Sequence, residues 1–287
     1  MTDSPTRPCP TFEAAGVRGS RATTDVNCSH YGGDTTCLVL TSSTGEHLLV
    51  DGGSGLSRLN SFFASDEDIS IFISHAHLDH IQGFLFFDAF SKADKKITIH
   101  CSATTQGALT HLFAPPYFPI SLTKLPSTPR WNIFPNDAGC HLFHTPSFQC
   151  EAIPIPHPGG AYGLLVTDKT TGETILVLND IEIHPNEPFE QQPGLKPLLQ
   201  CVQSRASVDT LIVDAMFDPS DMATHKGWGH SDFKTAITFG TYLQARTIYL
   251  AHHNPTASDT LLTSRQQAIS EPNVSILRQH HVHPWKV

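Results

Sequence analysis

The sequence predicts an α/β fold in which two β-sheets pack face to face and helices cover the outside. Short apolar runs, each bounded by turn residues, recur along the chain and indicate strands. They fall into two groups, and helical segments lie between some of them. The expected strands cover residues 35–42, 46–53, 69–74 and 96–101 in the first group and residues 161–168, 173–180, 209–216 and 246–253 in the second.

Three segments are expected to form helices. Residues 80–93 follow a predicted strand, and residues 102–114 and 231–245 each begin with a serine that can serve as an N-cap. Residues 114–135, which connect the two groups of strands, are rich in proline and aromatic residues rather than glycine and serine. We therefore expect a packed loop there and not a flexible linker between domains.

The composition indicates one globular domain. The chain has 287 residues, of which 39% are hydrophobic and 16% are charged, so it can build a core and is not generally disordered. We expect an N-terminal tail over residues 1–15 and a single domain over residues 16–287.

Charge and cysteine usage restrict the partners and the compartment. The net charge is −9, with only 18 Lys and Arg and no basic run, which disfavours a large nucleic-acid partner. No apolar stretch approaches membrane-spanning length, so no membrane partner is expected. The first 16 residues lack the apolar core of a signal peptide. Seven scattered cysteines without a C-x-x-C pair indicate free thiols and a cytoplasmic protein.

Five predicted strands end on a group that can be charged: Asp51, His75, Asp180, Asp214 and His252. A carboxylate or imidazole buried at the end of an apolar strand is costly unless it is paired or bound to a metal. Five such endings predict that these side chains converge on one rim of the domain.

The segment "SHAHLDH" carries the strongest chemical signal. His75, His77, Asp79 and His80 follow a strand directly, so a turn can direct their side chains into one pocket. Imidazoles and a carboxylate together suit zinc and other divalent first-row metals. The spacing therefore predicts a metal site.

This segment resembles the first signature of the metallo-β-lactamase superfamily, and the resemblance extends over almost the whole chain. It implies a four-layered αβ/βα sandwich with two divalent metal ions, zinc or else manganese or iron, at one edge. The implied ligands of the first metal are His75, His77 and His157, the last of these in "PHPGGAYG". Those of the second are Asp79, His80 and His252, with Asp180 bridging both metals. His253 stays open as the alternative to His252.

The last third of the chain resembles the phosphodiesterase branch of that superfamily, including tRNA 3′-processing enzymes and cyclic-nucleotide-phosphodiesterase-like proteins. The matching segment contains Asp214 in "LIVDAM" and His230 in "GWGHS". Two metals can hold a bridging hydroxide and the phosphate oxygens for in-line attack. We expect His230 to protonate the leaving oxygen, with Ser231 as the helix N-cap and Asp214 orienting a histidine.

Four further residues are assigned supporting roles. Tyr117 and Phe118 in the proline-rich segment are candidates for stacking on a base, and Lys226 is a candidate for contacting a phosphate. Asp51 is expected to bond to a ligand side chain.

These observations predict a metal-dependent phosphodiesterase acting on a small phosphodiester such as a cyclic nucleotide, with a homodimer as a possible assembly. The alternatives are an RNA 3′-processing endonuclease, a lactamase or thioesterase, and a metal-loaded binding module without turnover. The long basic arm of the tRNA-processing enzymes is not visible in the sequence, which favours the small substrate.

Overall fold

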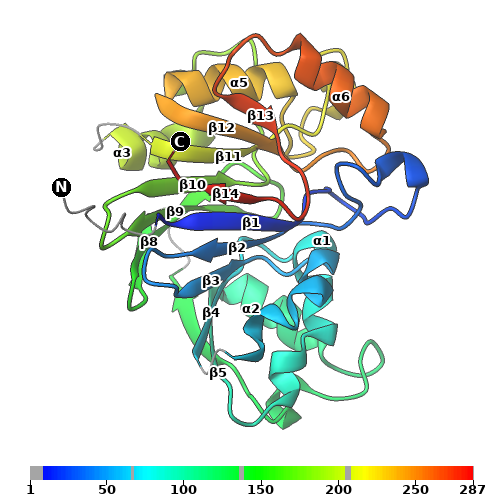
Figure 1. The fold of residues 1–287 in the computed structure, drawn as a ribbon, viewed down its shortest axis with the longest axis vertical. Helices are drawn as coiled ribbons and strands as arrows, with labels where there is room; N and C mark the ends of the chain where they lie inside the picture. Colours follow the sequence, from blue (N-terminus) through cyan, green and yellow to red (C-terminus); the bar gives the residue numbers. More distant parts are fainter. Residues whose placement is uncertain (1–8, 66–67, 136–138, 204–207, 287) are drawn as a thin grey trace, which may run out of the picture.

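A computed structural model of the chain describes residues 9–65, 68–135, 139–203 and 208–286. Two seven-stranded β-sheets pack face to face, and helices cover the outer face of each sheet (Figure 1). The predicted layered α/β fold is therefore confirmed.

The first sheet has the strand order β14-β1-β2-β3-β4-β5-β6. Its strands run antiparallel from β14 to β3 and parallel from β3 to β6. The bounds are Thr11–Gly16 for β1, Cys37–Thr41 for β2, His47–Val50 for β3, Asp68–Phe72 for β4, Lys96–Ser102 for β5, Arg130–Phe134 for β6 and Val282–Pro284 for β14.

The second sheet has the order β13-β12-β11-β10-β9-β8-β7. It is parallel from β13 to β10 and antiparallel from β10 to β7. The bounds are His141–His144 for β7, Phe148–Ile155 for β8, Ala161–Asp168 for β9, Thr174–Leu178 for β10, Val208–Asp214 for β11, Ala245–Ala251 for β12 and Val274–Ile276 for β13.

The helices lie on the two outer faces. In Figure 1, α3, α5 and α6 cover the second sheet, whereas α2 and several short 3₁₀-helices cover the first. None of the helices in the described residues has the length and apolar character to cross a lipid bilayer. The bounds are Leu78–Ile81 for α1, Ala103–Leu112 for α2, Lys196–Gln203 for α3, Met222–His225 for α4, Phe233–Tyr242 for α5 and Asp259–Ala268 for α6.

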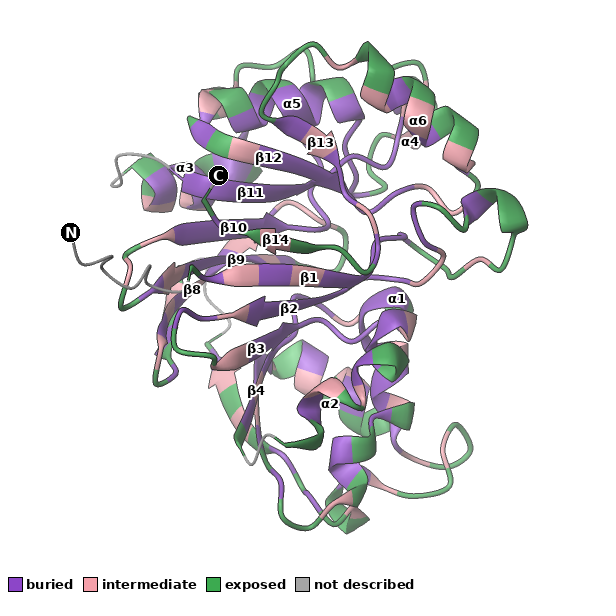
Figure 2. Cartoon of the chain, in the orientation of Figure 1, coloured by how far each residue is buried: buried purple, intermediate pink, exposed green. Residues whose placement is uncertain are grey.

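Three hydrophobic clusters hold these four layers together. One lies between the two sheets, and the other two lie between each sheet and its outer helices. In β2, Leu38 and Leu40 face the cluster between the sheets, while Cys37 and Val39 face the outer cluster. Side chains alternate along a strand, so a strand that is apolar throughout is buried on both faces. Figure 2 shows this as buried central strands under helices with exposed outer sides.

The predicted N-terminal tail, residues 1–15, includes residues that belong to the folded domain. Thr11–Gly16 forms β1, which pairs with β2 and with the C-terminal strand β14, so residues 11–15 belong to the first sheet. The signal was missed because Ala14, Ala15 and Gly16 are weak strand formers. Pairing with two neighbouring strands outweighs that propensity.

The segment between the two halves is only partly a loop. It contains a 3₁₀ turn at Leu122–Lys124, and its end forms β6 at the edge of the first sheet. The first group of strands therefore extends into the proline-rich segment. β7 and β8 were also not predicted.

The helix expected over residues 80–93 is broken into short pieces. After α1, 3₁₀-helices cover Gln82–Phe86 and Asp88–Ser91. Phe84, Phe87 and Phe90 are all buried and contact one another. A spacing of three residues matches the three residues per turn of a 3₁₀-helix, so that geometry turns all three rings toward the core.

Helix capping agrees with the prediction in one case and differs in the other. Ser102 caps α2 by accepting a hydrogen bond from the Thr105 amide at 3.1 Å. The cap of α5 is Asp232 instead of Ser231, because the Asp232 carboxylate accepts from the amides of Lys234 and Thr235, both at 3.0 Å.

Asp168, at the end of β9, joins the two halves of the molecule and supports a prediction about stability. Its carboxylate accepts hydrogen bonds from the amide and hydroxyl of Ser43, at 2.7 and 2.9 Å, and from the amides of Thr170 and Thr171. Burial favours the neutral acid, but these donors together lower the pKa of Asp168 below its ordinary value.

We expect Asp168→Asn to lower the free energy of unfolding at pH 7 by about 1–3 kcal/mol, because bonds to a charged acceptor are lost. A carboxylate with a lowered pKa stabilises the fold above its unfolded pKa of about 4, and this contribution disappears as the pH falls through the lower folded value. In urea titrations, the difference from wild type should therefore shrink below about pH 4. Asp94→Asn, at an exposed carboxylate, is the control; a difference independent of pH would contradict the assignment.

Candidate metal centre

The five strand-end residues singled out in the sequence come together at one rim, as expected. β3 and β4 are parallel neighbours in the first sheet, and β10, β11 and β12 are parallel neighbours in the second. The carboxyl ends of parallel strands meet at the same edge, which is where open α/β sheets place their sites. Asp51, His75, Asp180, Asp214 and His252 follow or end these five strands.

A first group of potential ligands contains His75, His77, His157 and Asp180, whose ligand atoms all lie within 4.8 Å of one another. His75 Nε2 and His157 Nε2 are each 3.7 Å from Asp180 Oδ2. His157 Nε2 also lies 3.1 Å from His77 Nδ1. His77 is the residue before α1, and its side chain is the one exposed member of the group.

A second group contains Asp79, His80, Asp180 and His252. The other oxygen of Asp180, Oδ1, lies 2.9 Å from His80 Nε2 and 3.2 Å from His252 Nδ1. Asp79 Oδ2 lies 3.5 Å from His80 Nε2 and 3.8 Å from His252 Nε2. Asp180 thus directs one oxygen into each group, which is the arrangement of a bridging carboxylate.

The geometry distinguishes His252 from His253. His253 points to the other side of the chain, where its Nε2 lies 2.8 Å from the carbonyl oxygen of Leu277. His252 is buried in the second group, and its φ of 55° lies in the left-handed region that few residues other than glycine adopt. Such strained residues cluster at functional sites.

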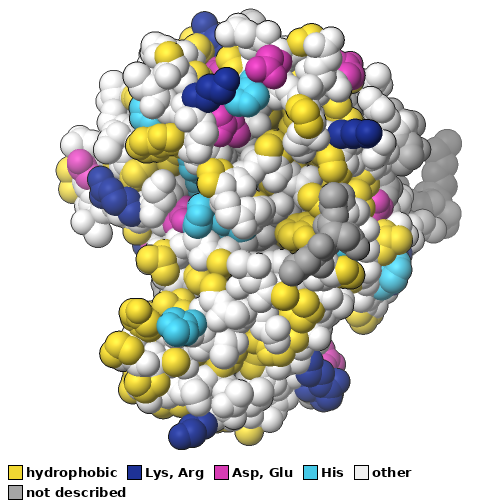
Figure 3. All heavy atoms as spheres, turned by 180° about the vertical axis from the view of Figure 1, so that it is seen from behind, with side chains coloured by type: hydrophobic (Ala, Val, Ile, Leu, Met, Phe, Trp, Pro, Cys, Tyr) yellow, Lys and Arg dark blue, Asp and Glu magenta, His cyan; other side chains and the backbone are white. Residues whose placement is uncertain are grey.

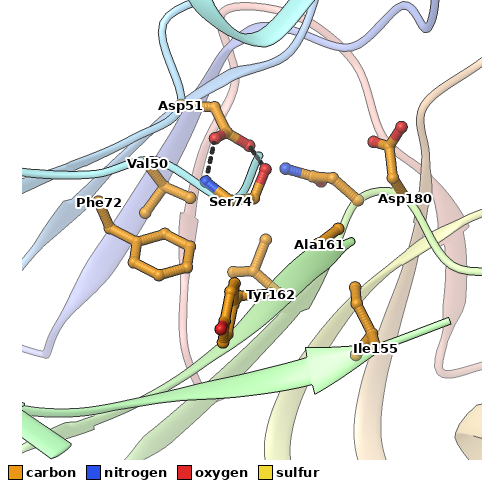
Figure 4. A pocket seen from close by; sticks show the side chains of 10 residues that line it. Val50, Asp51, Phe72, Ser74, Ile155, Ala161, Tyr162 and Asp180 are labelled. Carbon is orange, nitrogen blue, oxygen red and sulfur yellow. Dashed lines mark hydrogen bonds between the residues drawn. The ribbon is translucent and has the colours of Figure 1, made fainter. Parts of the chain in front are cut away.

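Asp51 supports the centre from behind, as predicted. Its Oδ1 accepts from the amide of Ser74 at 2.8 Å, and its Oδ2 accepts from the Ser74 hydroxyl at 2.9 Å (Figure 4). Asp51 Oδ2 is also 2.9 Å from His80 Nδ1. This contact leaves His80 Nε2 free to face Asp180, and it fixes the orientation of the imidazole ring. Asp51 and Asp180 both line a small cavity of about 10 Å³, and Figure 4 shows them above the apolar side chains of Ile155 and Tyr162.

The donor set fits divalent metal ions. Four buried atoms of the cluster make no contact with hydrogen-bond geometry among the described residues, even where His80 Nε2 and Asp180 Oδ1 lie 2.9 Å apart: His75 Nε2, His80 Nε2, Asp180 Oδ1 and His252 Nε2. Buried polar atoms without a partner are rare and costly, unless they are the atoms that hold a ligand. Imidazole nitrogens and carboxylate oxygens are the usual ligands of zinc and of other first-row divalent ions.

The electrostatics of the cluster also favour a cation. Burial opposes the charge on Asp180, but His252, His80 and His75 hold its pKa well below the usual range. Burial likewise opposes the charge on His80, yet the surrounding carboxylates raise its pKa well above the ordinary value. Asp180, Asp79 and Asp51 thus make this a site where positive charge is stabilised.

His230 and Asp214 form a buried pair beside the second group. His230 Nδ1 lies 2.7 Å from Asp214 Oδ2 and 4.0 Å from Asp180 Oδ2. Burial disfavours the imidazolium, but Asp214, together with Asp180 and Asp79, raises the pKa of His230 to about 9. Burial raises the pKa of Asp214 above its ordinary value, and the 2.7 Å contact lets its carboxylate balance the charge of a protonated His230. His230 is therefore able to donate a proton.

Ser231 has a structural role that differs from the predicted cap. Its hydroxyl donates to the carbonyl oxygen of Ile181 at 2.6 Å and accepts from the amide of Ile183 at 3.1 Å. Since Ile181 directly follows Asp180, these bonds fasten the start of α5 to the segment that carries Asp180.

The mouth of the centre is a cavity of about 540 Å³ between the two halves. It is lined by Ser20, His77, Leu78, Asp79, Pro158, Gly227, Trp228 and His230.

The three tentative substrate residues do not line this mouth. Tyr117 is exposed and packs against His111, and the ring of Phe118 packs against Phe86 and Phe113. Lys226 lines a neighbouring cavity of about 290 Å³. Their roles as substrate contacts stay predictions, because an aromatic residue in a proline-rich loop reveals its composition in the sequence but not the direction in which its side chain points.

Several residues that shape the site escaped the sequence analysis. The amide of Ser20 donates to Asp79 Oδ2 at 2.7 Å, and the Thr36 hydroxyl lies 3.1 Å from His252 Nδ1. Gly19 lies directly against the imidazole of His252. Only the glycine within "VRGSRA" was a signal, because close approach of the backbone requires the absence of a side chain.

A methyl group at Gly19 would overlap the His252 ring and crowd Met216. We expect Gly19→Ala to weaken metal retention by about 10- to 100-fold, the usual effect of disturbing the surroundings of a ligand. Metal content after dialysis against a chelator provides the measurement. Gly107→Ala, in α2 with no neighbouring atom within 4 Å, is the matched control. Equal metal content in wild type and Gly19→Ala would show that the ring can move aside.

The family comparison gives a match over most of the chain. The model of the family described as Beta-lactamase superfamily domain matches residues 47–253, which include all seven potential ligands. No curated protein sequence matches this chain.

Solved structures reproduce the whole fold at low sequence identity. Human tRNase Z, short form, has a TM-score of 0.66 at 18% identity, covering 96% of this chain and 100% of that protein. The metallo-β-lactamase fold protein YhfI from Bacillus subtilis gives 0.69 at 17%, covering 96% and 99%. Yeast PDE1 gives 0.64 at 15%, covering 96% and 99%. The family match over residues 47–253, together with this likeness of fold, shows that the chain belongs to the metallo-β-lactamase superfamily.

Proposed function

We propose that this protein is a phosphodiesterase that uses two divalent metal ions to hydrolyse a small phosphodiester such as a cyclic nucleotide. The observation that carries the proposal is the position of His230, a proton donor paired with Asp214, next to the carboxylate that both ligand groups share. Hydrolysis of a phosphodiester produces an alkoxide, which needs a proton as it leaves. The likeness to tRNase Z and PDE1 is consistent with this chemistry, although the argument rests on the site.

His75, His77, His157 and Asp180 would hold one metal, and Asp79, His80, Asp180 and His252 would hold the other. When bound, the two ions supply Lewis acidity that neutralises the phosphate oxygens and makes water nucleophilic at neutral pH.

The protein side chains perform the remaining steps. Asp79 lines the mouth, so its carboxylate can orient the attacking water by accepting its hydrogen bond. The water gives up one proton to solvent, and its oxygen forms a bond to phosphorus as the bond from phosphorus to the leaving oxygen breaks. His230 passes its Nε2 proton to that oxygen, and Asp214 holds the imidazole through Nδ1.

The mouth favours a small substrate over a folded RNA. No Lys or Arg is among its described lining residues. On the face seen in Figure 3 the basic side chains are scattered and form no continuous patch. An enzyme that grips a long phosphate backbone needs a basic surface. All seven cysteines are free thiols, which supports placing the proposed activity in the cytoplasm.

The test is hydrolysis by purified protein reconstituted with Zn²⁺, Mn²⁺ or Fe²⁺. We expect turnover of bis-p-nitrophenyl phosphate and of at least one member of a panel of cyclic nucleotides and dinucleotides. Asp79→Ala should abolish both activities, whereas Asp94→Asn, on the surface, should not. No turnover with any of the three metals would refute the proposal. Opening of a lactam ring with phosphodiesters left intact would favour a lactamase.

A further inference from the structure

The mouth of the metal centre carries two large apolar side chains that are exposed. Leu78, on the first half, and Trp228, on the second half, have relative exposures of 62% and 60%, and both line the cavity of about 540 Å³. An exposed tryptophan beside a polar site loses the stabilisation that burial would bring. Its position at the mouth therefore calls for a functional explanation.

The loop that bears Trp228 is held on both sides by a single carboxylate. The amides of Gly227 and Gly229 donate to the two oxygens of the buried Glu182, at 2.7 and 2.8 Å. Both glycines have φ near 85°, at 84° and 88°, a conformation that favours glycine. These contacts fix the backbone on either side of Trp228, and with it the point at the mouth from which the indole extends.

The same loop is tied to the residues that carry the proposed chemistry. The carbonyl oxygen of Gly229 accepts from His157 Nδ1 at 2.9 Å, and His230 follows directly in the chain. The indole packs edge-on against the ring of His225, with 4.6 Å between centroids and an interplanar angle of 75°. Trp228 is therefore supported from within the protein while much of its surface still faces the mouth.

We propose that Trp228 determines the substrate specificity of this site by stacking on a nucleobase attached to the phosphodiester at the metal centre. Leu78 adds apolar contact from the α1 side of the cavity. The inference rests on the proposed phosphodiesterase function and narrows its substrate class to nucleotides. Every base offers a π-face to an indole, so this stack selects nucleotides over simple alkyl phosphodiesters without distinguishing strongly among the bases.

The experiment compares two substrates that share p-nitrophenolate as the leaving group. One is the p-nitrophenyl ester of thymidine 5′-monophosphate, and the other is methyl p-nitrophenyl phosphate, which has no base. With Mn²⁺-loaded protein, we expect Trp228→Ala to raise KM for the thymidine ester about tenfold more than for the methyl ester. Trp228→Phe should recover most of that difference. Leu142→Ala, which removes an equally exposed side chain from the edge strand β7, is the matched control.

Each outcome decides between the possibilities. Equal changes in KM for the two esters would overturn the stacking role and leave the phosphodiesterase proposal intact. If the wild-type protein hydrolyses neither ester nor any phosphodiester of the panel with Zn²⁺, Mn²⁺ or Fe²⁺, the proposed function fails, and stacking is judged by calorimetric binding of thymidine 5′-monophosphate against methyl phosphate. In that case, tighter binding of thymidine 5′-monophosphate than of methyl phosphate by the wild-type protein, and equal binding of the two by Trp228→Ala, would support the stacking role. The same ratio of affinities for the two ligands in the wild type and in Trp228→Ala would overturn the stacking role.

Discussion

Replacing Asp180 by alanine is expected to remove bound metal from both ligand groups and to reduce hydrolysis by more than about 100-fold. The physical reason is that Oδ1 faces His80 and His252, whereas Oδ2 faces His75 and His157. Removing a residue that only hydrogen-bonds to a metal ligand typically lowers metal affinity or activity by about 10- to 100-fold. The loss should be larger for Asp180, because Asp180 is proposed to contact both ions directly. Metal content by plasma mass spectrometry and turnover of bis-p-nitrophenyl phosphate measure the two effects.

Two further variants test whether the loss of metal comes from the charge of Asp180 or from a general loss of stability. Asp180→Asn keeps the size of the side chain but removes the negative charge that balances the imidazoles, so it should also lose metal. Asp209→Asn changes another buried carboxylate, at the opposite end of β11, where it accepts from the amide of Thr174 at 2.9 Å. That control should keep its metal. Two equivalents of metal in Asp180→Ala would contradict the bridging assignment.

Replacing His230 by alanine is expected to leave the metal content intact while slowing substrates with poor leaving groups by about 100-fold or more. His230 is placed to protonate the leaving oxygen, and p-nitrophenolate needs little protonation because p-nitrophenol is much more acidic than an alcohol. The loss should therefore be much smaller with p-nitrophenyl esters. Rates for thymidine 5′-phosphate esters of phenols with increasing pKa measure this, and the variant should show the steeper dependence.

Asp214→Asn provides the matched test of the pair. Asp214 contacts His230 without lining the mouth, so its loss should reduce the rate in the same leaving-group-dependent way, but less strongly. A uniform loss for good and poor leaving groups in His230→Ala would assign His230 to phosphate binding instead of proton transfer. A loss of metal in His230→Ala would place His230 among the metal ligands. That outcome has to be tested because Asp214, His230 and His252 also lie close enough together to hold a metal ion.

The fold was predictable where the strands are continuous apolar runs. β10, β11 and β12 each contain a buried apolar run, Ile175–Leu178, Leu211–Val213 and Ile248–Ala251, and a group that can be charged marks the end of each strand. β1, β6 and β14 escaped the analysis because they lie at or near the edge of the first sheet and carry mixed residues. Their strand conformation depends on the neighbours with which they pair.

The site was predictable to a similar degree. Local spacing predicted His75, His77, Asp79 and His80, and the resemblance to a known family added the distant residues. The structure then brought His157, Asp180 and His252 to the same four residues. The roles of Tyr117 and Phe118 were not predictable, because nothing in a loop sequence encodes which way an aromatic ring turns.

By itself, the sequence determined the chemical nature of the centre. Imidazoles and carboxylates at the ends of apolar strands are too costly to bury without a partner, and their order along the chain matched one superfamily. Only the tertiary structure decided how these groups face one another. It directed the two oxygens of Asp180 to different groups, turned His253 away and held Trp228 at the mouth through Glu182. Contacts between residues far apart in the chain depend on how the two sheets pack, and no local pattern encodes that packing.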